Sequence, residues 1–146
     1  VETFEGSDEH SKINFEKVEE NFNHNLEPYK DRFFLSKGTS NLFFENKNKV
    51  NSELFDIIYI DGSHQYEDVI SDLEISIKNL SPKGLIVIDD SSLYLDYSPE
   101  YIEKKFRIKS SKGHEDPSRA LVEILKKYKE IEILITVGHI NVIHFK

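Results

Sequence analysis

Three amino acids are missing from the 146-residue sequence altogether: cysteine, methionine and tryptophan. Without cysteine, the chain can form neither disulfide bonds nor thiolate metal sites, and this absence weakly favours a reducing compartment. The sequence also lacks an apolar run of the length that crosses a bilayer, and it shows no signal-peptide pattern. From these absences we predict a cytoplasmic protein that has no membrane partner.

Glycine is scarce as well, with six residues, and there is no glycine-rich loop of the kind that binds phosphates or nucleosides. A doubly wound α/β domain needs such a turn directly after its first strand. Because the sequence starts at Val1 without that strand and turn, we expect it to be the C-terminal part of a longer protein. The alternative is a domain that is completed by another chain.

The balance of charge is acidic, with a formal net charge of −8. A protein that binds nucleic acid needs a basic face to contact phosphates, so we predict no nucleic-acid partner. Hydrophobic residues make up 38% of the sequence and aromatic residues 12%, which is enough for a buried core. Length and composition together predict one globular domain over residues 1–146.

Two apolar runs, at residues 55–60 and 84–88, organise the chain. Neither run alternates with polar residues, so each predicts a strand that is buried on both faces of a parallel sheet. Between the runs, apolar residues recur at helical spacing, namely Tyr66, Ile70, Leu73, Ile77 and Leu80. A strand, a helix and a second strand of these lengths predict a right-handed crossover unit of an α/β fold.

Polar residues follow both predicted strands: Asp61 and His64 come after the first, and Asp89 and Asp90 after the second. Neighbouring parallel strands end at the same edge of a sheet, which is where open α/β sheets bind ligands. Three carboxylates at one edge are tolerated when they are solvated, protonated or gathered around a cation. Oxygen ligands suit a hard ion such as Mg²⁺, and His64 could then remove a proton from a hydroxyl group.

The alternative for these residues is that each carboxylate only ends a strand, caps a helix and faces water. For any single aspartate this alternative is the better interpretation. The combination of three aspartates with one histidine at the same edge favours the functional interpretation.

The motifs Ile-Asp-Gly-Ser-His, which contains Asp61 and His64, and Val-Ile-Asp-Asp, which ends in Asp89 and Asp90, resemble those of a known family. The family is the class I S-adenosylmethionine-dependent methyltransferases of the metal-assisted O-methyltransferase type, with relatives such as catechol O-methyltransferase and the antibiotic-sugar O-methyltransferases. This resemblance implies that Asp61, Asp89 and Asp90 bind Mg²⁺ or another hard divalent cation, and that His64 is the catalytic base. It also implies an α/β fold with a Rossmann-like, doubly wound, mostly parallel sheet that ends in an antiparallel hairpin.

The same resemblance implies contacts to the cofactor S-adenosylmethionine. Glu2 matches the acidic residue after the second strand, whose carboxylate accepts hydrogen bonds from the ribose hydroxyls. Gly38, Ser40 and Asn41 lie in a turn similar to the Gly-Ala-Ser-Gln turn of catechol O-methyltransferase, where the Ser and Gln contact the adenine. The alternatives are simpler: Glu2 is an exposed terminal residue, Gly38 ends a strand, and Ser40 starts a helix.

Other local patterns predict the remaining elements before and after this core. Apolar residues at helical spacing predict a helix at residues 15–26, which Pro28 ends, and a short strand follows at residues 32–35. Residues 91–115 form a long connection that contains a short helix at residues 99–107. Its apolar residues either contact the acceptor or belong to an ordinary surface loop; they are Leu93, Tyr94, Leu95 and Tyr97.

The end of the sequence predicts a helix followed by a hairpin. Asp116 and Pro117 start the helix, and its sheet-facing residues are Leu121, Ile124, Leu125 and Tyr128. Residues 131–137 and 140–145 flank a Gly-His pair, which suits a tight antiparallel hairpin. His139 and His144 are interpreted as structural or surface residues.

The resemblance thus implies an enzyme that transfers a methyl group from S-adenosylmethionine to a hydroxyl group of a small molecule, assisted by a metal ion. A metal-dependent hydrolase that uses the same carboxylates is one alternative, although no arginine and lysine clamp for a phosphate accompanies them. A non-catalytic, methyltransferase-like module that binds a partner protein is the other. The acceptor, the metal and a homo-oligomeric state are left open by the sequence.

Overall fold

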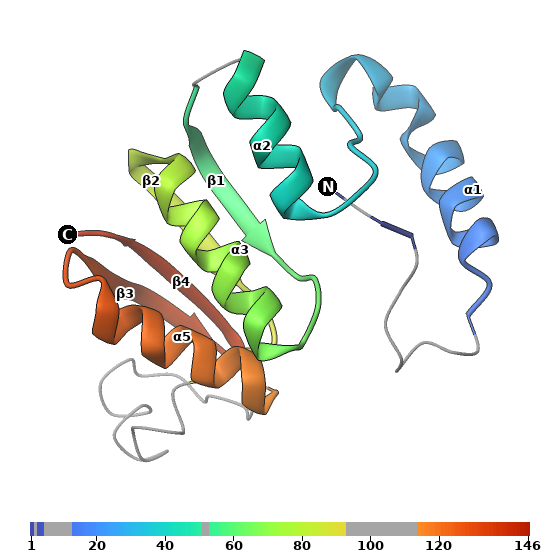
Figure 1. Cartoon of the computed structure of the whole chain (residues 1–146). Helices are drawn as coiled ribbons and strands as arrows, with labels where there is room; N and C mark the ends of the chain where they lie inside the picture. The colour runs from blue at the N-terminus through green and yellow to red at the C-terminus, as the bar shows by residue number, and fades with distance from the viewer. Residues whose placement is uncertain (2, 5–12, 51–52, 93–113) are drawn as a thin grey trace. The chain divides into compact units, whose positions relative to one another are not determined.

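Figure 1 shows the computed structural model of the protein, which describes residues 1, 3–4, 13–50, 53–92 and 114–146. The chain divides into two compact units, an N-terminal unit at Val1–Ser52 and a C-terminal unit at Glu53–Lys146. The organisation of residues 1–146 as one domain therefore stays a prediction.

The described residues of the N-terminal unit form three helical elements: the α-helix α1 (Phe15–Leu26), the 3₁₀-helix η2 (Glu27–Arg32) and the α-helix α2 (Ser40–Val50). The predicted helix at residues 15–26 is confirmed. The side chain of Asn14 caps its start, because Asn14 Oδ1 accepts a hydrogen bond of 3.1 Å from the Lys17 N–H.

One local prediction in the N-terminal unit is wrong. The strand expected at residues 32–35 is not formed, since Pro28 fixes a helical turn directly after α1 and η2 extends to Arg32. Ser40 starts a helix, as the simpler alternative for this turn has it, because α2 begins there. Thr39 caps the helix, since its Oγ1 accepts a hydrogen bond of 3.3 Å from the Leu42 N–H.

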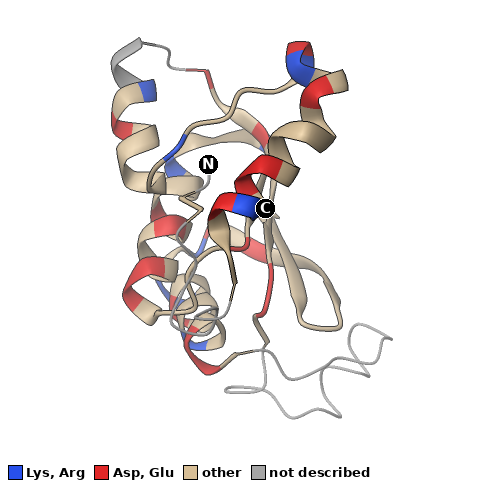
Figure 2. Cartoon of the chain, turned by 90° about the vertical axis from the view of Figure 1, so that its right-hand side faces the viewer, with Lys and Arg blue, Asp and Glu red and all other residues tan. Residues whose placement is uncertain are grey.

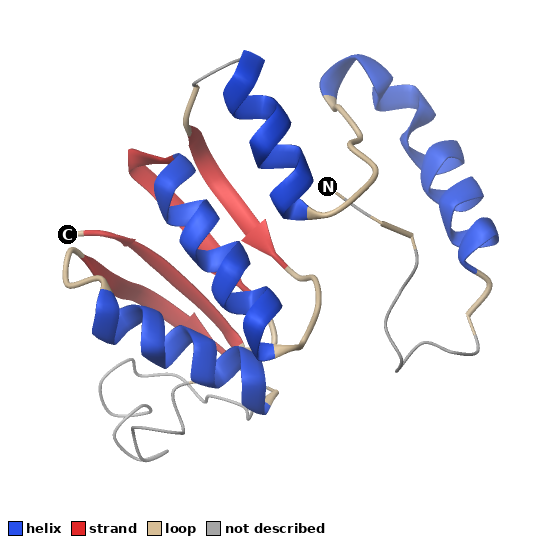
Figure 3. Cartoon of the chain, in the orientation of Figure 1, coloured by secondary structure: helices blue, strands red, loops and turns tan. Residues whose placement is uncertain are grey.

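The C-terminal unit is an α/β layer (Figure 3). Its elements in chain order are β1 (Phe55–Ile60), α3 (Tyr66–Asn79), β2 (Leu80–Ile88), α5 (Glu115–Lys127), β3 (Ile131–Val137) and β4 (Ile140–Phe145). The strands form one sheet in the order β1-β2-β4-β3. β1 and β2 pair in parallel, whereas β4 pairs antiparallel with both β2 and β3. The predicted crossover unit, the C-terminal hairpin and the α/β fold class are confirmed.

The core of the C-terminal unit lies between the sheet and the two helices α3 and α5, which cover the same face of the sheet (Figure 1). Its largest fully buried apolar residues are Leu73, Ile86, Ile88, Leu121, Ile124 and Ile143. The predicted helical spacing is confirmed from Tyr66 to Ile77, whereas Leu80 is the first residue of β2. The sheet-facing residues predicted for the last helix belong to this core or pack against it.

The opposite face of the sheet is far more open. On β1, the side chains of Ile57 and Tyr59 are 65% and 54% exposed, and Val137 on β3 is 54% exposed. The prediction that residues 55–60 are buried on both faces is therefore wrong for this unit. The reason is that, within the described part of the C-terminal unit, α3 and α5 cover only one face.

The last helix also begins earlier than predicted. α5 starts at Glu115, with His114 at the N-cap position, rather than at Asp116. The short helix predicted at residues 99–107, and the apolar residues Leu93, Tyr94, Leu95 and Tyr97, lie outside the described residues. No helix in the described ranges is both long enough and apolar enough to span a membrane.

Gly84 occupies the point where β2 departs from regular pairing with β1. Phe55 pairs with Leu80 but Ile57 pairs with Leu85, so β2 carries extra residues between these two partners. A Cβ atom at Gly84 would lie 2.6 Å from Leu80 Cδ1 and 2.9 Å from the Phe55 carbonyl oxygen. Glycine is therefore required here by close approach of the backbone.

We expect Gly84→Ala to destabilise the fold by about 1–3 kcal/mol, the usual cost of overpacking a tight site. Urea unfolding of the two proteins measures this difference. Gly62→Ala is the matched control, because a Cβ atom there would meet only Asp72 Oδ2, at 3.7 Å. Equal stability of Gly84→Ala and the unmodified chain would contradict the assignment.

Candidate active site at the carboxyl edge of β1 and β2

The ends of β1 and β2 meet at one edge of the sheet. The Asp89 N–H donates a hydrogen bond of 3.0 Å to the Ile60 carbonyl, which joins the residue after β2 to the last residue of β1. Asp61 follows β1, and Asp89 and Asp90 follow β2. The structure thus places all three predicted metal ligands at the edge where parallel strands bind ligands.

Asp90 has a backbone conformation that few non-glycine residues adopt, with φ at +48°. Three hydrogen bonds fix the backbone around it. Its N–H donates to Asp89 Oδ1 over 2.8 Å, its carbonyl accepts from the His114 N–H over 2.7 Å, and the following Ser91 N–H donates to the His139 carbonyl over 2.9 Å. The strained residue is therefore held in place by its surroundings.

A buried polar network lies beneath Asp90. Asn141 Nδ2 donates to Ser91 Oγ over 2.9 Å, and Thr136 Oγ1 donates to Asn141 Oδ1 over 2.7 Å. All three side chains are fully buried. Every buried side-chain polar atom in the described residues has a hydrogen-bond partner. The segment after β2 is thus fixed from the β3–β4 hairpin.

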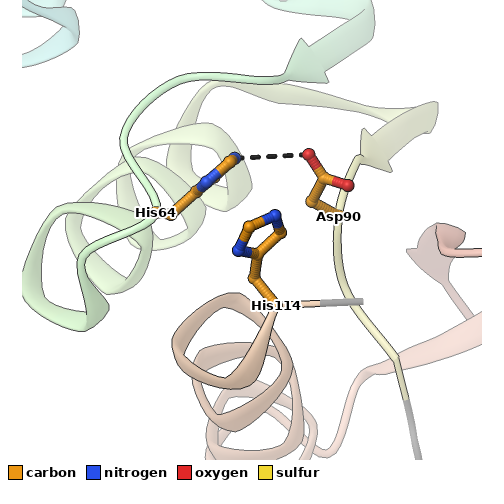
Figure 4. Close-up of side chains that lie close together, drawn as sticks. All are labelled: His64, Asp90 and His114. Carbon is orange, nitrogen blue, oxygen red and sulfur yellow. Dashed lines mark ion pairs between the residues drawn. The ribbon is translucent and has the colours of Figure 1, made fainter. Parts of the chain in front are cut away.

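His64 and His114 lie beside the Asp90 carboxylate (Figure 4). His64 Nε2 is 3.2 Å from Asp90 Oδ2, and both side chains are half-buried. The imidazole of His114 stacks on that of His64, with 4.0 Å between ring centroids and an angle of 31° between the planes. His64 thus lies close to the carboxylates, as the sequence predicted, whereas His114 was not predicted as a site residue.

His139 also reaches this edge, although the sequence analysis interpreted it as a structural or surface residue. Its Nε2 lies 3.3 Å from Asp89 Oδ1 and 3.7 Å from Asp90 Oδ1. The position follows from the sheet, because β4 pairs with β2 so that Asn141 lies opposite Ile88. A histidine in the hairpin turn must then lie next to the residues after β2, and this signal was available once β4 was placed beside β2.

Tyr59 controls the chemistry of Asp89. Its hydroxyl donates a hydrogen bond to Asp89 Oδ2, and this bond, followed by desolvation and the charges of Asp89, Asp61 and Asp90, raises the pKa of Tyr59 to about 12. Partial burial raises the pKa of Asp89, but the hydrogen bonds from Tyr59 and from the Asp90 N–H, together with the nearby histidines, lower it overall. The ionised form of Asp89 is therefore favoured over the protonated form.

Asp61, the remaining predicted metal ligand, lies less close to the other potential ligands than Asp89 and Asp90 do. Two groups of three potential ligand residues occur in the described residues, His64 with Asp90 and His114, and Asp89 with Asp90 and His139. Asp61 belongs to neither group, although its charge acts on Tyr59.

The predicted cofactor residues belong to the N-terminal unit. Gly38, with φ at +134°, and Ser40 and Asn41 lie at the start of α2. This backbone conformation favours glycine. Glu2 lies outside the described residues. The cofactor-binding roles of all four residues stay predictions.

We expect Tyr59→Phe to raise the pKa of Asp89, because the carboxylate loses its hydrogen-bond donor. The titration of the Asp89 carboxyl carbon by NMR measures this change, with Tyr29→Phe in the N-terminal unit as control. Because the pKa of Asp89 is lowered in the folded chain, ionised Asp89 stabilises the fold at pH values above 3.8, the ordinary pKa of an aspartate. This stabilisation is lost as the pH falls from 3.8 through the lowered pKa. Tyr59→Phe should weaken that acid dependence, and an unchanged Asp89 titration would contradict the assigned hydrogen bond.

The fold is similar to that of two solved O-methyltransferase structures. An O-methyltransferase from Bacillus cereus in complex with SAH has a TM-score of 0.59 and 19% identity, over 100% of this chain and 62% of that chain. A proposed O-methyltransferase from Klebsiella pneumoniae has a TM-score of 0.56 and 17% identity, over 99% of this chain and 61% of that chain. The chain thus spans about three fifths of the length of each protein, and the likeness shows a Rossmann-like methyltransferase fold.

Sequence comparison gives a family. An uncharacterised protein of Acanthamoeba polyphaga mimivirus is 48% identical over 42 residues, which cover 29% of this chain and 18% of that protein. A family described as a methyltransferase domain matches residues 1–91, more than half of the chain. The match includes the predicted motifs around Asp61, His64, Asp89 and Asp90. The chain therefore belongs to the methyltransferase domain family.

Proposed function

We propose that this chain carries the acceptor-activating part of an enzyme that transfers the methyl group of S-adenosylmethionine to a hydroxyl group of a small molecule. The observation that carries the proposal is the 3.2 Å approach of His64 Nε2 to Asp90 Oδ2, beside Asp89, in a chain of the methyltransferase domain family. A base and a set of carboxylates therefore share the sheet edge that binds ligands in this type of fold.

The cofactor supplies the electrophilic methyl carbon when it is bound. The SAH complex of the Bacillus cereus structure supports S-adenosylmethionine as the donor. On this chain, Ser40 and Asn41 at the start of α2 are the proposed adenine contacts, Gly38 shapes their turn, and Glu2 is the proposed ribose contact.

The donor set of the sheet edge fits a hard divalent cation. Asp89 and Asp90 offer carboxylate oxygens, Asp61 follows the neighbouring strand, and oxygen donors are those that Mg²⁺ prefers. Both oxygens of Asp89 accept a hydrogen bond, Oδ2 from Tyr59 and Oδ1 from the Asp90 N–H, and each has a second lone pair with which it can bind a cation. Such a cation, when bound, lowers the pKa of an acceptor hydroxyl.

His64 is the proposed general base. Its side chain is 27% exposed, so an acceptor can reach it, and its Nε2 faces the carboxylates. A neutral imidazole accepts a proton near pH 7, which few other side chains do. The protein then has to hold the acceptor oxygen in line with the methyl carbon and the sulfur.

The acidic balance of the chain favours an uncharged or cationic small-molecule acceptor over an anionic one. Acidic residues outnumber basic ones by 27 to 19, and Figure 2 shows Asp and Glu along several elements with Lys and Arg between them. A cytoplasmic location, the absence of nucleic-acid and membrane partners, and a homo-oligomeric state remain parts of the proposal that the sequence suggested or left open.

We expect His64→Gln to lower the turnover number of the complete protein by roughly 10²–10⁴-fold, the usual contribution of a positioned base. Cofactor affinity should change little, because the imidazole faces the acceptor. Methyl transfer from labelled S-adenosylmethionine and cofactor calorimetry measure the two quantities. His144→Gln, on β4 beside Glu132, is the control. Normal turnover combined with lost cofactor binding would make His64 a binding residue instead.

We expect Asp89→Asn to weaken Mg²⁺ binding by at least about tenfold, since changes even outside the direct ligands of a metal cost 10–100-fold. The amide keeps the shape of the side chain and an acceptor for Tyr59. Titration calorimetry with Mg²⁺ gives the affinity, and Asp116→Asn, an exposed partner of Arg119, is the control. Unchanged Mg²⁺ binding in Asp89→Asn would remove Asp89 from the ligand set.

A further inference from the structure

The histidines at the carboxyl edge are not explained by a hard cation. Mg²⁺ selects oxygen ligands and keeps several waters, whereas imidazole nitrogen suits borderline ions such as Zn²⁺ and Co²⁺. A general base requires only one histidine, yet three lie at this edge. His64 lies within ion-pair distance of Asp90 and His139 of Asp89, and His114 stacks on His64. The presence of three imidazoles at this edge therefore needs an explanation other than Mg²⁺ binding and general-base catalysis.

Two groups of potential metal ligands lie at this edge. The composition of a transition-metal site is found in the first group, which consists of His64, Asp90 and His114. It offers two imidazoles and one carboxylate, and the three ligand atoms lie within 4.8 Å of one another. Figure 4 shows both imidazoles beside the carboxylate, with the dashed line joining His64 to Asp90. The second group, Asp89 with Asp90 and His139, offers one imidazole and two carboxylates.

The main chain holds two of these residues, Asp90 and His114, independently of any ion. His114 is tied to Asp90 through its N–H, and its own carbonyl accepts a hydrogen bond from Ser118 Oγ on α5. Ser118 Oγ in turn accepts from the Ser92 N–H over 2.9 Å. The side chain of His114 makes no capping hydrogen bond to α5, so helix capping does not account for this imidazole.

We propose that His64, Asp90 and His114 form a binding site for a borderline divalent transition-metal ion, with Zn²⁺ as the reference ion. Two imidazoles and a carboxylate are a ligand set that zinc adopts, with bonds of about 2.0–2.2 Å and a fourth position left open. Bonds of that length bring ligand atoms to within about 4 Å of one another. Small rotations of the three side chains, which are half-buried or exposed, would bring their ligand atoms from within 4.8 Å to within that distance.

This site and the proposed oxygen site share Asp90, so the two ions compete. Occupation by a transition-metal ion engages the His64 nitrogen as a ligand, and the imidazole can then no longer accept a proton. Trace Zn²⁺ therefore inhibits methyl transfer, a consequence that rests on the proposed function. Binding of the ion itself does not rest on it, because it needs only the three side chains.

The test uses the 146-residue chain after removal of metals with a chelator. Zn²⁺ and Mg²⁺ affinities are measured by calorimetry, and Co²⁺ binding is followed by its visible absorption, which reports the coordination number and nitrogen ligation. We expect one Zn²⁺ per chain, bound more tightly than Mg²⁺. His114→Ala should weaken Zn²⁺ binding by at least about tenfold, while Mg²⁺ binding stays unchanged. Failure of methyl transfer would leave these expectations intact.

Two matched variants separate this site from other histidines. His24→Ala removes an exposed histidine of α1, and His139→Ala removes the histidine of the second group. Neither should change the Zn²⁺ affinity as His114→Ala does. Zn²⁺ binding that survives in His114→Ala, or that is lost in His139→Ala instead, would overturn the proposal.

A measurement on the unmodified chain covers the case in which His114→Ala fails to fold. Imidazole ¹⁵N NMR of the metal-free chain should show the nitrogens of His64 and His114 shifting together on addition of one equivalent of Zn²⁺, with His24 and His144 unchanged. Shifts confined to other histidines, or spread equally over all of them, would overturn the assignment.

Discussion

The left-handed backbone of Asp90 is the constraint on which the rest of the site depends. A non-glycine residue in this region costs free energy, and it persists only where its neighbours fix it. Here the neighbours are the His114 N–H, the His139 carbonyl that accepts from Ser91, and the side chain of Asp89. The same hydrogen bonds that hold the backbone bring two histidines, from α5 and from the hairpin turn, to the end of β2.

Rigidity at this edge comes from buried polar groups rather than from the apolar core alone. Asn141 joins Ser91 to Thr136, and Ser118 joins Ser92 to His114, so the segment after β2 is attached to both the hairpin and the last helix. Since a buried polar group without a partner costs about 1–3 kcal/mol, each of these bonds also selects one arrangement of the segment. The polar network thus determines the position of the carboxylates, while the apolar core determines the sheet.

The crossover unit could be predicted because apolar runs and helical spacing are local signals. The edge that Asp61 and His64 share with Asp89 and Asp90 follows from the parallel pairing of β1 with β2. The exposed face of β1 could not be predicted, because burial depends on which helices cover a sheet and not on the strand's own residues. His114 and His139 were missed for the same reason: nothing local marks them, and only the pairing of β4 with β2 and the position of α5 bring them to Asp90. The start of α2 at Ser40 is a local signal too, because Thr39 and Ser40 are both residue types that favour a helix N-terminus, and Thr39 is the one that caps it.

The place of β4 between β2 and β3 has a kinetic consequence. Partners that pair between β1 and β2 lie 25 to 28 residues apart, whereas Ile86 of β2 and Ile143 of β4 lie 57 residues apart in the sequence. Contacts between residues far apart in the sequence carry a larger loop-closure entropy and slow folding. The pairing of β2 with β4, which brings His139 to Asp90, is the most non-local of the described sheet, so a chain in which it has not formed has the carboxylates but not the arrangement that gives them their chemistry.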